Sequence, residues 1–390
     1  MDAFYAAVEV RDDPMLLGKP LIIGALPNER GVVSTCSYEA RKFGVRSAMS
    51  IKEAYRRCPD GIYMHPDMRK YKQASDAIHK IWDQYTDLVE YVSLDEGYLD
   101  VTGSHHMFGG VHAIARAIKE QTLIENGLTC SVGIGYSMTT AKLASEEKKP
   151  DGLFEIPDRA FWFQLVMDRN VRTLYTVGGK TAEKMEAEGI LTVRDVLANE
   201  QKIIRMFGKH GQWIVALAGG IDERDVTPYN KEEAKSIGRE ITFQQDTTDT
   251  EYLKDTLLLI ARALSLKLRF ESIYCRTIGI KITYGNMAQI TRAKSGEATH
   301  HAHDIYRVAS ALFDAVEKKP IRLIGISLSN FTKESVHQMS LTDIIESNNT
   351  QKKYVLETEL FNLQKKFGVD IIKTGAELQA EKRLKGDDLP

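Results

Sequence analysis

The stretch Tyr91–Asp100 constrains this chain most, because its apolar and aromatic residues flank two adjacent acids, Asp95 and Glu96. The apolar positions suit a β-strand, and Gly97 suits a bend beside the acids. Two carboxylates at the end of a buried strand are costly to hold unless a cation faces them. Carboxylate oxygens are ligands that hard ions such as Mg²⁺ prefer, so the stretch favours a metal site. The alternative is a solvated acid pair in a turn.

Composition narrows the class of protein. A chain of 390 residues indicates more than one domain. Because the net charge is only −2, any surface for nucleic acid must be a local basic patch. The four cysteines lack CxxC spacing, which argues against a zinc site and a disulfide framework and fits a reducing cytoplasm. The chain shows neither a signal-peptide pattern nor an apolar run long enough to span a membrane.

Short strands and helices alternate in the first part of the chain. A helix is expected from Met1 onward with Asp2 as its N-cap, and short strands at 20–24 and 31–35. The next helix starts after Ser37 and places Tyr38 and Arg41 on one face, three residues apart. Such a face can hold a phosphate. The alternative is an ordinary surface helix.

The acid-bearing stretch is followed by more of the same alternation. We expect a helix over about 110–125, a strand over 129–135, and a helix from about 141 that ends near 148–152. Strands and helices in this order predict an α/β layer around the acids.

The region 161–218 reads as short helices, with a Gly-Gly bend before a helix start at Gly178-Gly179-Lys180. This pattern resembles a helix-hairpin-helix, whose backbone amides point at a phosphate. A plain helical hairpin is the alternative. A Walker A loop is excluded, because the earlier glycine and the preceding strand are absent. The charged stretch 229–234 is interpreted as a linker.

The region 235–331 runs strand, helix, strand, strand, helix, strand, with isoleucines at alternate positions around 278–282. It holds fourteen Lys and Arg against ten Asp and Glu. We expect helices on one sheet face, with Lys281, Arg292 and Lys294 on the other, where a nucleic-acid backbone can lie. The alternative is a solvated sheet face. A further amphipathic helix is expected over 354–366.

Several motifs occur together in order. They are Phe4-Tyr5-Ala6, the stretches 34–44 and 93–100, Lys148-Lys149-Pro150-Asp151-Gly152, and Lys235-Ser236-Ile237-Gly238 ahead of the β-rich region. In this order they resemble the Y-family DNA polymerases, in particular the DNA polymerase IV branch, over about residues 1–331. No single motif is decisive, but jointly they are specific.

The resemblance implies an α+β multidomain fold shaped like a right hand. This comprises a mixed α/β palm, small fingers, a helical thumb with a helix-hairpin-helix, and a βαββαβ little-finger domain. The implied bounds are palm 1–9 and 67–157, fingers 10–66, thumb 158–228, linker 229–234, little finger 235–331 and a C-terminal tail 332–390.

The resemblance also implies the chemistry, an error-prone translesion synthesis in which two Mg²⁺ ions assist attack of a primer 3′-hydroxyl on a dNTP. Asp95 and Glu96 match the catalytic and metal-binding acids. Met1 matches a residue that offers its backbone carbonyl to the metal.

Other positions match the residues that surround the nucleotide. Tyr38, Arg41 and Lys149 match the triphosphate contacts, and Thr35 adds a hydrogen bond. Tyr5 matches the steric gate, a ring that collides with a ribose 2′-hydroxyl. For DNA binding we expect Gly178, Lys180 and the three basic residues of the sheet.

The implied partners are primer–template DNA and dNTPs, bound by a cytoplasmic monomer. Residues Gln338–Thr342 partly fit the family's sliding-clamp motif, with Thr342 where an aromatic or aliphatic residue usually stands.

Family sequences also carry an apolar strand that ends in Asp, a third metal ligand, immediately before the position of Met1. In the chain as written two acids hold Mg²⁺ weakly, so we expect reduced polymerase activity. The alternative function is a catalytically impaired DNA-binding accessory protein. A nucleotide cyclase with a related palm leaves the 34–44 motif and the hairpin unexplained.

Overall fold

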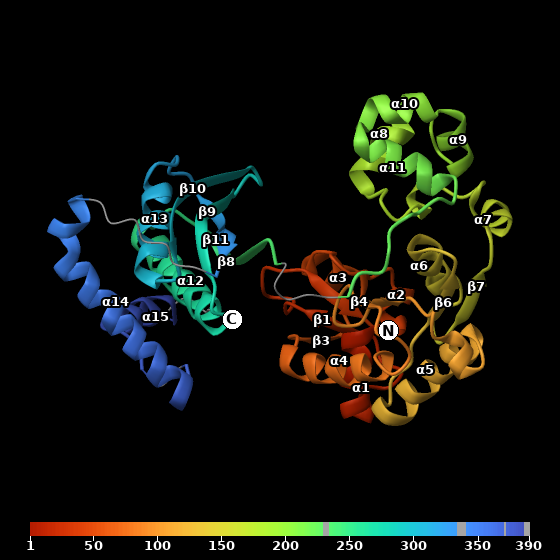
Figure 1. Cartoon of the computed structure of the whole chain (residues 1–390), viewed down its shortest axis with the longest axis horizontal. Helices are drawn as coiled ribbons and strands as arrows, with labels where there is room; N and C mark the ends of the chain where they lie inside the picture. Colours follow the sequence, from red (N-terminus) through yellow and green to blue (C-terminus); the bar gives the residue numbers. More distant parts are fainter. Residues whose placement is uncertain (229–233, 334–340, 370–371, 386–390) are drawn as a thin grey trace. The chain divides into compact units, whose positions relative to one another are not determined.

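The structure, a computed structural model, describes residues 1–228, 234–333, 341–369 and 372–385, with the backbone alone for 341–353 and 385 (Figure 1). The chain divides into two compact units, Met1–Tyr229 and Asn230–Pro390. The division falls at the segment interpreted as a linker, of which residues 229–233 lie outside the described residues. Each unit has buried apolar clusters of its own, as separate domains require.

Unit 1 begins with a helix and a three-stranded sheet. The elements are α1 (Phe4–Asp12), η1 (Pro14–Leu16), β1 (Leu21–Gly24), β2 (Val33–Cys36), α2 (Tyr38–Lys42), α3 (Ile51–Arg57) and β3 (Ile62–Met64). The strand order is β2-β1-β3, with β2 antiparallel and β3 parallel to β1. Leu21 and Ile23 enter one buried cluster and Ile22 enters another, because alternate side chains of a strand point to opposite faces. Strand β1 thus joins the predicted fingers to the predicted palm.

The middle of unit 1 contains two separate two-stranded sheets. Its elements are α4 (Met68–Trp82), β4 (Val89–Tyr91), β5 (Gly97–Leu99), η2 (His105–Phe108), α5 (Val111–Asn126), β6 (Val132–Gly135), α6 (Met138–Glu147) and β7 (Leu153–Ile156). Strands β4 and β5 pair antiparallel, and β6 and β7 pair parallel. The expected alternation of strand and helix is therefore present.

The acids do not lie at the end of one strand, as the sequence suggested. They lie in the loop between β4 and β5, where the backbone amides of Val92 and Ser93 both donate to the carbonyl oxygen of Glu96. Gly97 begins strand β5 in close contact with the Trp82 ring. A Cβ at this position would lie only 2.7 Å from Trp82 Cζ3, so the site requires glycine. The chain therefore reverses direction at the two acids, and these backbone hydrogen bonds close a hairpin where a continuous strand was expected.

The expected N-cap at Asp2 is also wrong. Helix α1 starts at Phe4, and Ala3 precedes it in the left-handed conformation, with φ 45° and no side-chain cap. The Asp2 carboxylate is used elsewhere, because it accepts hydrogen bonds from Ser131 Oγ and from the backbone nitrogen of Asp151, both at 2.8 Å. Asp2 thereby ties the start of the chain to the regions that flank β6 and β7.

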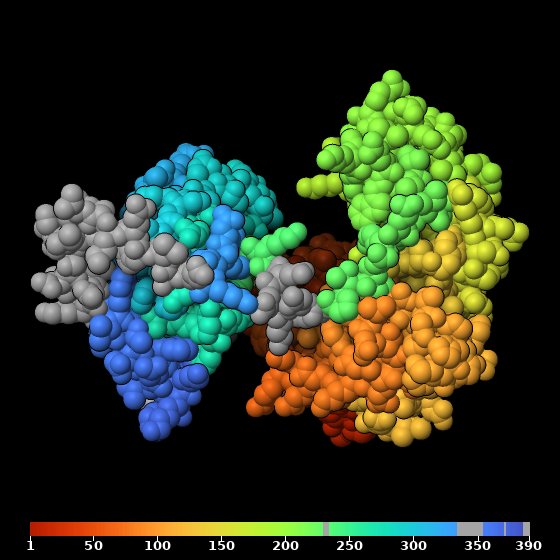
Figure 2. All heavy atoms as spheres, viewed as in Figure 1, coloured from red at the N-terminus to blue at the C-terminus, as the bar shows by residue number. Residues whose placement is uncertain are grey.

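The last part of unit 1 is helical, as expected. It comprises α7 (Arg159–Val166), η3 (Val171–Thr173), α8 (Gly179–Ala187), α9 (Val193–Ala198), α10 (Glu200–Phe207) and α11 (Lys209–Ala218). Their apolar faces share one buried cluster around Trp162. In Figure 2 the green atoms of this group form a lobe of their own within unit 1.

Unit 2 has the expected βαββαβ order. Its elements are β8 (Ser236–Thr247), α12 (Thr250–Phe270), β9 (Tyr274–Tyr284), β10 (Gln289–Thr299), α13 (Ala302–Asp314) and β11 (Ile321–Thr332). The strand order is β10-β9-β11-β8, all antiparallel. Ile278, Ile280 and Ile282 face the cluster that includes the buried faces of α12 and α13.

The expectation that three basic residues share the open face of this sheet is wrong. In the register, Lys281 pairs with Thr291, whereas Arg292 pairs with Ile280 and Lys294 with Ile278. Residues directly opposite each other in a sheet share a face, so Arg292 and Lys294 lie on the helix side and Lys281 on the open side. Strand β10 is an exposed edge, which is why basic side chains are tolerated on that side.

Two further helices follow, α14 (Leu341–Phe367) and α15 (Gly375–Lys385). The predicted helix 354–366 lies inside α14. Of the predicted clamp motif, residues 338–340 lie outside the described residues and only the backbone of 341–342 is described. Among the described residues, no helix combines the length and the apolarity that crossing a membrane requires.

Candidate active site

The acid pair is accessible at the tip of the β4–β5 hairpin. The side chains of Asp95 and Glu96 are 30% and 40% exposed. Asp95 Oδ1 accepts a hydrogen bond of 2.9 Å from Ser93 Oγ, which fixes one face of the carboxylate. Both carboxylates are therefore in contact with water. Asp95 Oδ2 lies 3.9 Å from the Met1 amino nitrogen, and Glu96 Oε1 lies 2.7 Å from Lys142 Nζ.

A chain of alternating charges leads from the acids along α6. Lys142 Nζ lies 2.7 Å from Glu96 Oε1 and 3.2 Å from Glu146 Oε1. Lys149 Nζ in turn lies 3.1 Å from Glu146 Oε1. Burial alone would lower the pKa of Lys142, but the hydrogen bond and charge of Glu96 raise it, so the amine stays cationic. Lys149, a predicted triphosphate contact, is thus linked to the acid turn.

The backbone around Met1 lies directly beside the turn. The Met1 nitrogen donates to the Asp95 carbonyl oxygen at 2.8 Å, and the Asp2 nitrogen donates to the Thr129 carbonyl oxygen at 3.2 Å. Residues 1 and 2 therefore bridge the end of the β4–β5 hairpin and the chain that enters β6. This position agrees with a metal contact by the Met1 carbonyl, which stays a prediction.

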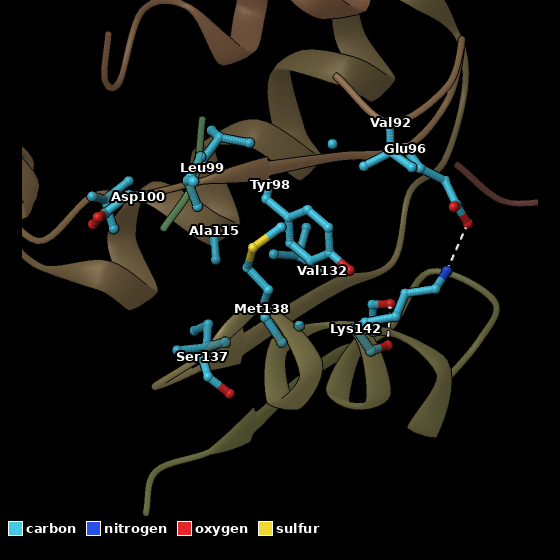
Figure 3. A pocket seen from close by; sticks show the side chains of 18 of the residues that line it. Val92, Glu96, Tyr98, Leu99, Asp100, Ala115, Val132, Ser137, Met138 and Lys142 are labelled. Atoms are coloured by element: carbon cyan, nitrogen blue, oxygen red, sulfur yellow. Dashed lines mark hydrogen bonds and ion pairs between the residues drawn. The ribbon is translucent and has the colours of Figure 1, made fainter. Parts of the chain in front are cut away.

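A cavity of about 630 Å³ opens next to these residues. Strand β5 lines one side and β6 the other, and α5 contributes Ile114, Ala115 and Ile118. Figure 3 shows Tyr98 and Met138 turned into this space and Lys142 reaching Glu96. Among the described strands, β5 pairs only with β4 and β6 only with β7, so two strand edges border the cavity. Met1, Asp95, Glu96 and Lys149 all line it.

Tyr38 and Arg41 lie together on α2, as expected, and their binding of a phosphate stays a prediction. Ser37 caps this short helix by accepting from the Ala40 amide, and the Arg41 guanidinium carbon lies 4.6 Å from the centre of the Tyr38 ring. Tyr38 Oη is buried and makes no hydrogen bond of ordinary geometry to any described residue. Burial raises the pKa of Tyr38, with the charges of Asp2 and Glu146 contributing. A buried hydroxyl without a partner is costly, and this one is available to a ligand oxygen.

Thr35 lies in β2, next to the buried Cys36, and is half-buried. Its strand leads into Ser37 and the start of α2, so it is close in the chain to Tyr38. The hydrogen bond to triphosphate expected for Thr35 stays a prediction.

Tyr5 lies on the first turn of α1 and is half-buried. Burial raises its pKa, and the negative charge of Asp95 adds to the effect, which places the ring within the electrostatic reach of the acid pair. Its ring stacks on that of Tyr71 from α4, with centroids 4.1 Å apart and planes 8° from parallel. Tyr5 thus lies within electrostatic reach of Asp95, and Lys149 lines the cavity together with Asp95.

We call the β4–β5 turn with Asp95 and Glu96, together with the adjoining Met1, the acid corner. Its oxygen ligands fit Mg²⁺ only together with further ligands from a bound molecule. No group of three or more His, Cys, Asp or Glu side chains within the described ranges is arranged to hold a metal ion. Magnesium in nucleotide sites takes one or two carboxylates and completes its shell with phosphate oxygens and water. Asp95, Glu96 and a neighbouring backbone carbonyl therefore fit Mg²⁺ together with a phosphate-bearing ligand.

The predicted DNA contacts lie in two places. Gly178 precedes α8 without a side-chain cap, and Lys180 is exposed in its first turn. Uncapped amides at a helix start attract anions. In unit 2, Lys281 is held by Glu240, whose oxygens lie 2.9 and 3.1 Å from its Nζ. Because Glu240 partly neutralises it, Lys281 attracts a phosphate less strongly than the sequence suggested.

Sequence reasoning missed four residues that shape the corner, namely Lys142 and Glu146 on α6 and Tyr71 and Glu9 behind Tyr5. Lys142 and Glu146 lie four residues apart on α6, which puts them on one helix side, a signal that was available in the sequence. Tyr71 and Glu9 carried no local signal, because each is an ordinary residue of a helix and gains its role only through the contact between α1 and α4.

Comparisons with known proteins agree with this geometry. The impB/mucB/samB family matches residues 1–146, and the impB/mucB/samB family C-terminal domain matches 234–341. A DNA polymerase IV of Halorhodospira halophila is 39% identical over 345 residues, 87% of this chain and 95% of the relative.

Among solved structures, a Y-family DNA polymerase chimera is 25% identical with a TM-score of 0.76, over 85% of this chain and 98% of that chain. The insertion ternary complex of Dbh DNA polymerase is also 25% identical, with a TM-score of 0.59 and the same coverage. The chain therefore belongs to the impB/mucB/samB family, as a DNA polymerase IV-like member of the Y-family DNA polymerases.

Proposed function

We propose that this protein is a template-directed DNA polymerase of the error-prone translesion type, which adds deoxynucleotides to a primer 3′-hydroxyl. One observation carries the proposal. Two adjacent, accessible carboxylates lie in one corner with a ring that can face a sugar and with cations that can face a triphosphate. The family membership and the likeness to a polymerase in an insertion ternary complex support it.

Asp95 and Glu96 would hold two Mg²⁺ ions together with the triphosphate, and the Met1 carbonyl would add an oxygen ligand. The ions would supply activation of the primer 3′-hydroxyl and neutralisation of charge on the phosphates. Lys142 Nζ lies 2.7 Å from Glu96 Oε1 and holds this carboxylate in position. The turn thus presents fixed negative charge where the cations of the reaction have to gather.

The triphosphate is bound by Tyr38, Arg41 and Lys149, with Thr35 nearby. Within the described ranges, Tyr38 Oη makes no hydrogen bond of ordinary geometry, and a phosphate oxygen can supply one. The cations make charge-assisted hydrogen bonds, which strengthen as charge builds up on the leaving phosphate. Tyr5 acts as the steric gate and excludes the 2′-hydroxyl of a ribonucleotide.

Primer–template DNA is bound at two places, the start of α8 through Gly178 and Lys180, and the sheet of unit 2. There Lys281 lies on the open face, and Arg292 and Lys294 lie along the edge strand β10. Contacts of this kind read the phosphate backbone and carry no sequence preference. The segment Gln338–Thr342 stays a proposed sliding-clamp contact.

A second candidate function is a DNA-binding accessory protein with impaired catalysis. The observation in its favour is that the described acids near the cavity do not form a group of three ligands. The weaker the hold on Mg²⁺, the smaller the polymerase activity. In this second function the protein binds DNA through the same contacts but does not add nucleotides efficiently.

Primer extension separates the two functions. With Mg²⁺ and dNTPs, extension that depends on the template supports the polymerase, whereas tight primer–template binding without extension supports the accessory protein. A variant with an added apolar strand ending in Asp before Met1 is the informative partner. We expect that strand to enter the cavity between β5 and β6, bring a third carboxylate and raise extension. Unchanged extension would refute this expectation.

A further inference from the structure

The ring of Tyr5 has a buried support. Tyr71 from α4 is fully buried, and its ring lies parallel to that of Tyr5 at a centroid distance of 4.1 Å. Phe4 touches the same ring at an angle, with centroids 6.5 Å apart. Tyr71 therefore fills the space behind Tyr5, and any shift of the Tyr71 ring moves the surface on which Tyr5 rests.

The position of Tyr71 is fixed by charge as well as by packing. Its hydroxyl donates to Glu9 Oε1 at 2.7 Å, and Lys70 Nζ lies 2.7 Å from Glu9 Oε2. Glu9 is only 4% exposed. Burial and the bond to Glu9 raise the pKa of Tyr71, so the hydroxyl stays protonated and remains a donor. The bond to Glu9 likewise raises the pKa of Lys70.

Such an arrangement is more than core packing needs. A buried carboxylate is costly, and apolar residues of similar size often serve stability as well or better. Here each Glu9 oxygen has its own partner, and one of those partners is the ring beneath Tyr5. A stacked pair alone resists sliding weakly, because offset geometries are close in energy. The hydrogen bond at the far end of Tyr71 removes that freedom.

We propose that Tyr71, held by the Glu9–Lys70 pair, is a positioning residue that sets how closely Tyr5 approaches the sugar of the incoming nucleotide. Glu9 and Lys70 thereby contribute to the choice of deoxynucleotides over ribonucleotides without touching the substrate. This inference rests on the proposed role of Tyr5 as steric gate.

The test measures binding and needs no turnover. The protein is bound to primer–template DNA with a 3′-dideoxy primer end, and the dissociation constants of the matching dNTP and rNTP are measured with Mg²⁺. We expect Tyr71→Leu, which removes stack and hydroxyl, to reduce the rNTP/dNTP ratio of these constants about tenfold, equivalent to roughly 1.4 kcal/mol. Tyr71→Phe and Glu9→Gln, which keep the stack, are expected to reduce it about threefold.

Tyr85→Phe is the matched control. Tyr85 is another buried tyrosine of unit 1, and its hydroxyl donates to Gln121 Oε1 at 2.8 Å. Its ring contacts Phe108, away from Tyr5. Thermal unfolding is measured for each variant. A merely structural role predicts that Tyr71→Phe and Tyr85→Phe lose similar stability and leave the selectivity unchanged, which would overturn the inference.

Tyr5→Ala separates this inference from the gate itself. If Tyr5→Ala abolishes selectivity and the Tyr71 variants do not reduce it, the gate role stands and the positioning role is wrong. If Tyr5→Ala leaves selectivity intact, or if the parent protein binds neither nucleotide, the gate role and the inference fail together.

Discussion

The acid corner of unit 1 and the sheet of unit 2 are built in opposite ways. The corner contains two-stranded sheets with three- or four-residue strands and two strand edges along a cavity. Its buried Tyr38 hydroxyl has no hydrogen-bond partner in the part of the chain that the structure describes. Unit 2 pairs four strands of 11 or 12 residues over one core, with register shifts only near the strand ends. Among the described residues, buried polar atoms without a partner occur in both regions, for example Thr283 Oγ1 in unit 2, so the difference lies in the strands. Long paired strands supply shape, whereas short strands with unpaired edges leave a cavity that a ligand can enter.

The first prediction tests whether the core of unit 2 contributes stability without affecting nucleotide binding by unit 1. Ile326 is buried on the central strand β11, so Ile326→Ala should reduce the free energy of unfolding of unit 2 by about 2–5 kcal/mol. Nucleotide binding by unit 1 should not change. Denaturant unfolding and dNTP titration check both parts. Ser327→Ala, the exposed neighbour on the same strand, is the control and should be near neutral.

The second prediction concerns the corner. Arg41→Ala removes a cation from the proposed triphosphate site, and dNTP binding should weaken about thirtyfold, equivalent to roughly 2 kcal/mol. Global stability should hardly change. Arg56→Ala is the matched control, because Arg56 is a 76% exposed arginine of the same region that pairs with Glu53. Equal effects of the two variants on dNTP affinity would argue against a phosphate contact at Arg41.

The third prediction uses pH to probe how the chain after α11 is attached to unit 1. Burial disfavours ionised Asp222, yet hydrogen bonds from Arg224 and Thr139 lower its pKa to about 2. Since the folded pKa lies below the unfolded one, this stabilisation is present above pH ~4 and disappears toward pH 2. Asp222→Asn should therefore cost roughly 2 kcal/mol at pH 7 and progressively less below pH ~4.

Unfolding of parent and Asp222→Asn between pH 7 and pH 3 measures this difference. Asp225→Asn, at an exposed acid of the same segment, is the control. A penalty that does not shrink as the pH falls would show that the loss comes from packing and has no link to the ionisation of Asp222.

The smallest effect is expected on the sheet face. Lys281→Ala should lower the salt dependence of primer–template binding by up to about one unit of slope, and less if Glu240 already neutralises it. Arg292→Ala tests the other side of β10. A larger effect for Arg292 than for Lys281 in a salt titration would move the DNA contact from the open face to the edge strand.

The sequence predicted more of unit 2 than of the corner. Alternating isoleucines at 278, 280 and 282 revealed the strand and its buried face, because period-two burial is a local pattern. The face of Arg292 was missed, because the register between β9 and β10 depends on where the turn closes and shifts by one residue without changing either strand's pattern.

In the acid corner, the residue types indicated which side chains form the site, but the sequence did not predict how the backbone arranges them. Asp95 and Glu96 stood out as adjacent acids in an apolar stretch, but the hairpin around them was not expected. Asp2 looked like a helix cap, and instead its carboxylate bonds to Ser131 and Asp151. These contacts span more than a hundred residues, so no local pattern contains them.

The most direct test of the account is single-nucleotide incorporation by the parent protein and by Asp95→Ala, on the same primer–template with Mg²⁺. Asp87→Ala, at an exposed acid before β4, is the control. We predict that the parent and Asp87→Ala extend the primer, whereas Asp95→Ala binds DNA equally well and loses incorporation by about a hundredfold or more. Incorporation retained by Asp95→Ala would contradict the claim that the acid turn is the catalytic centre.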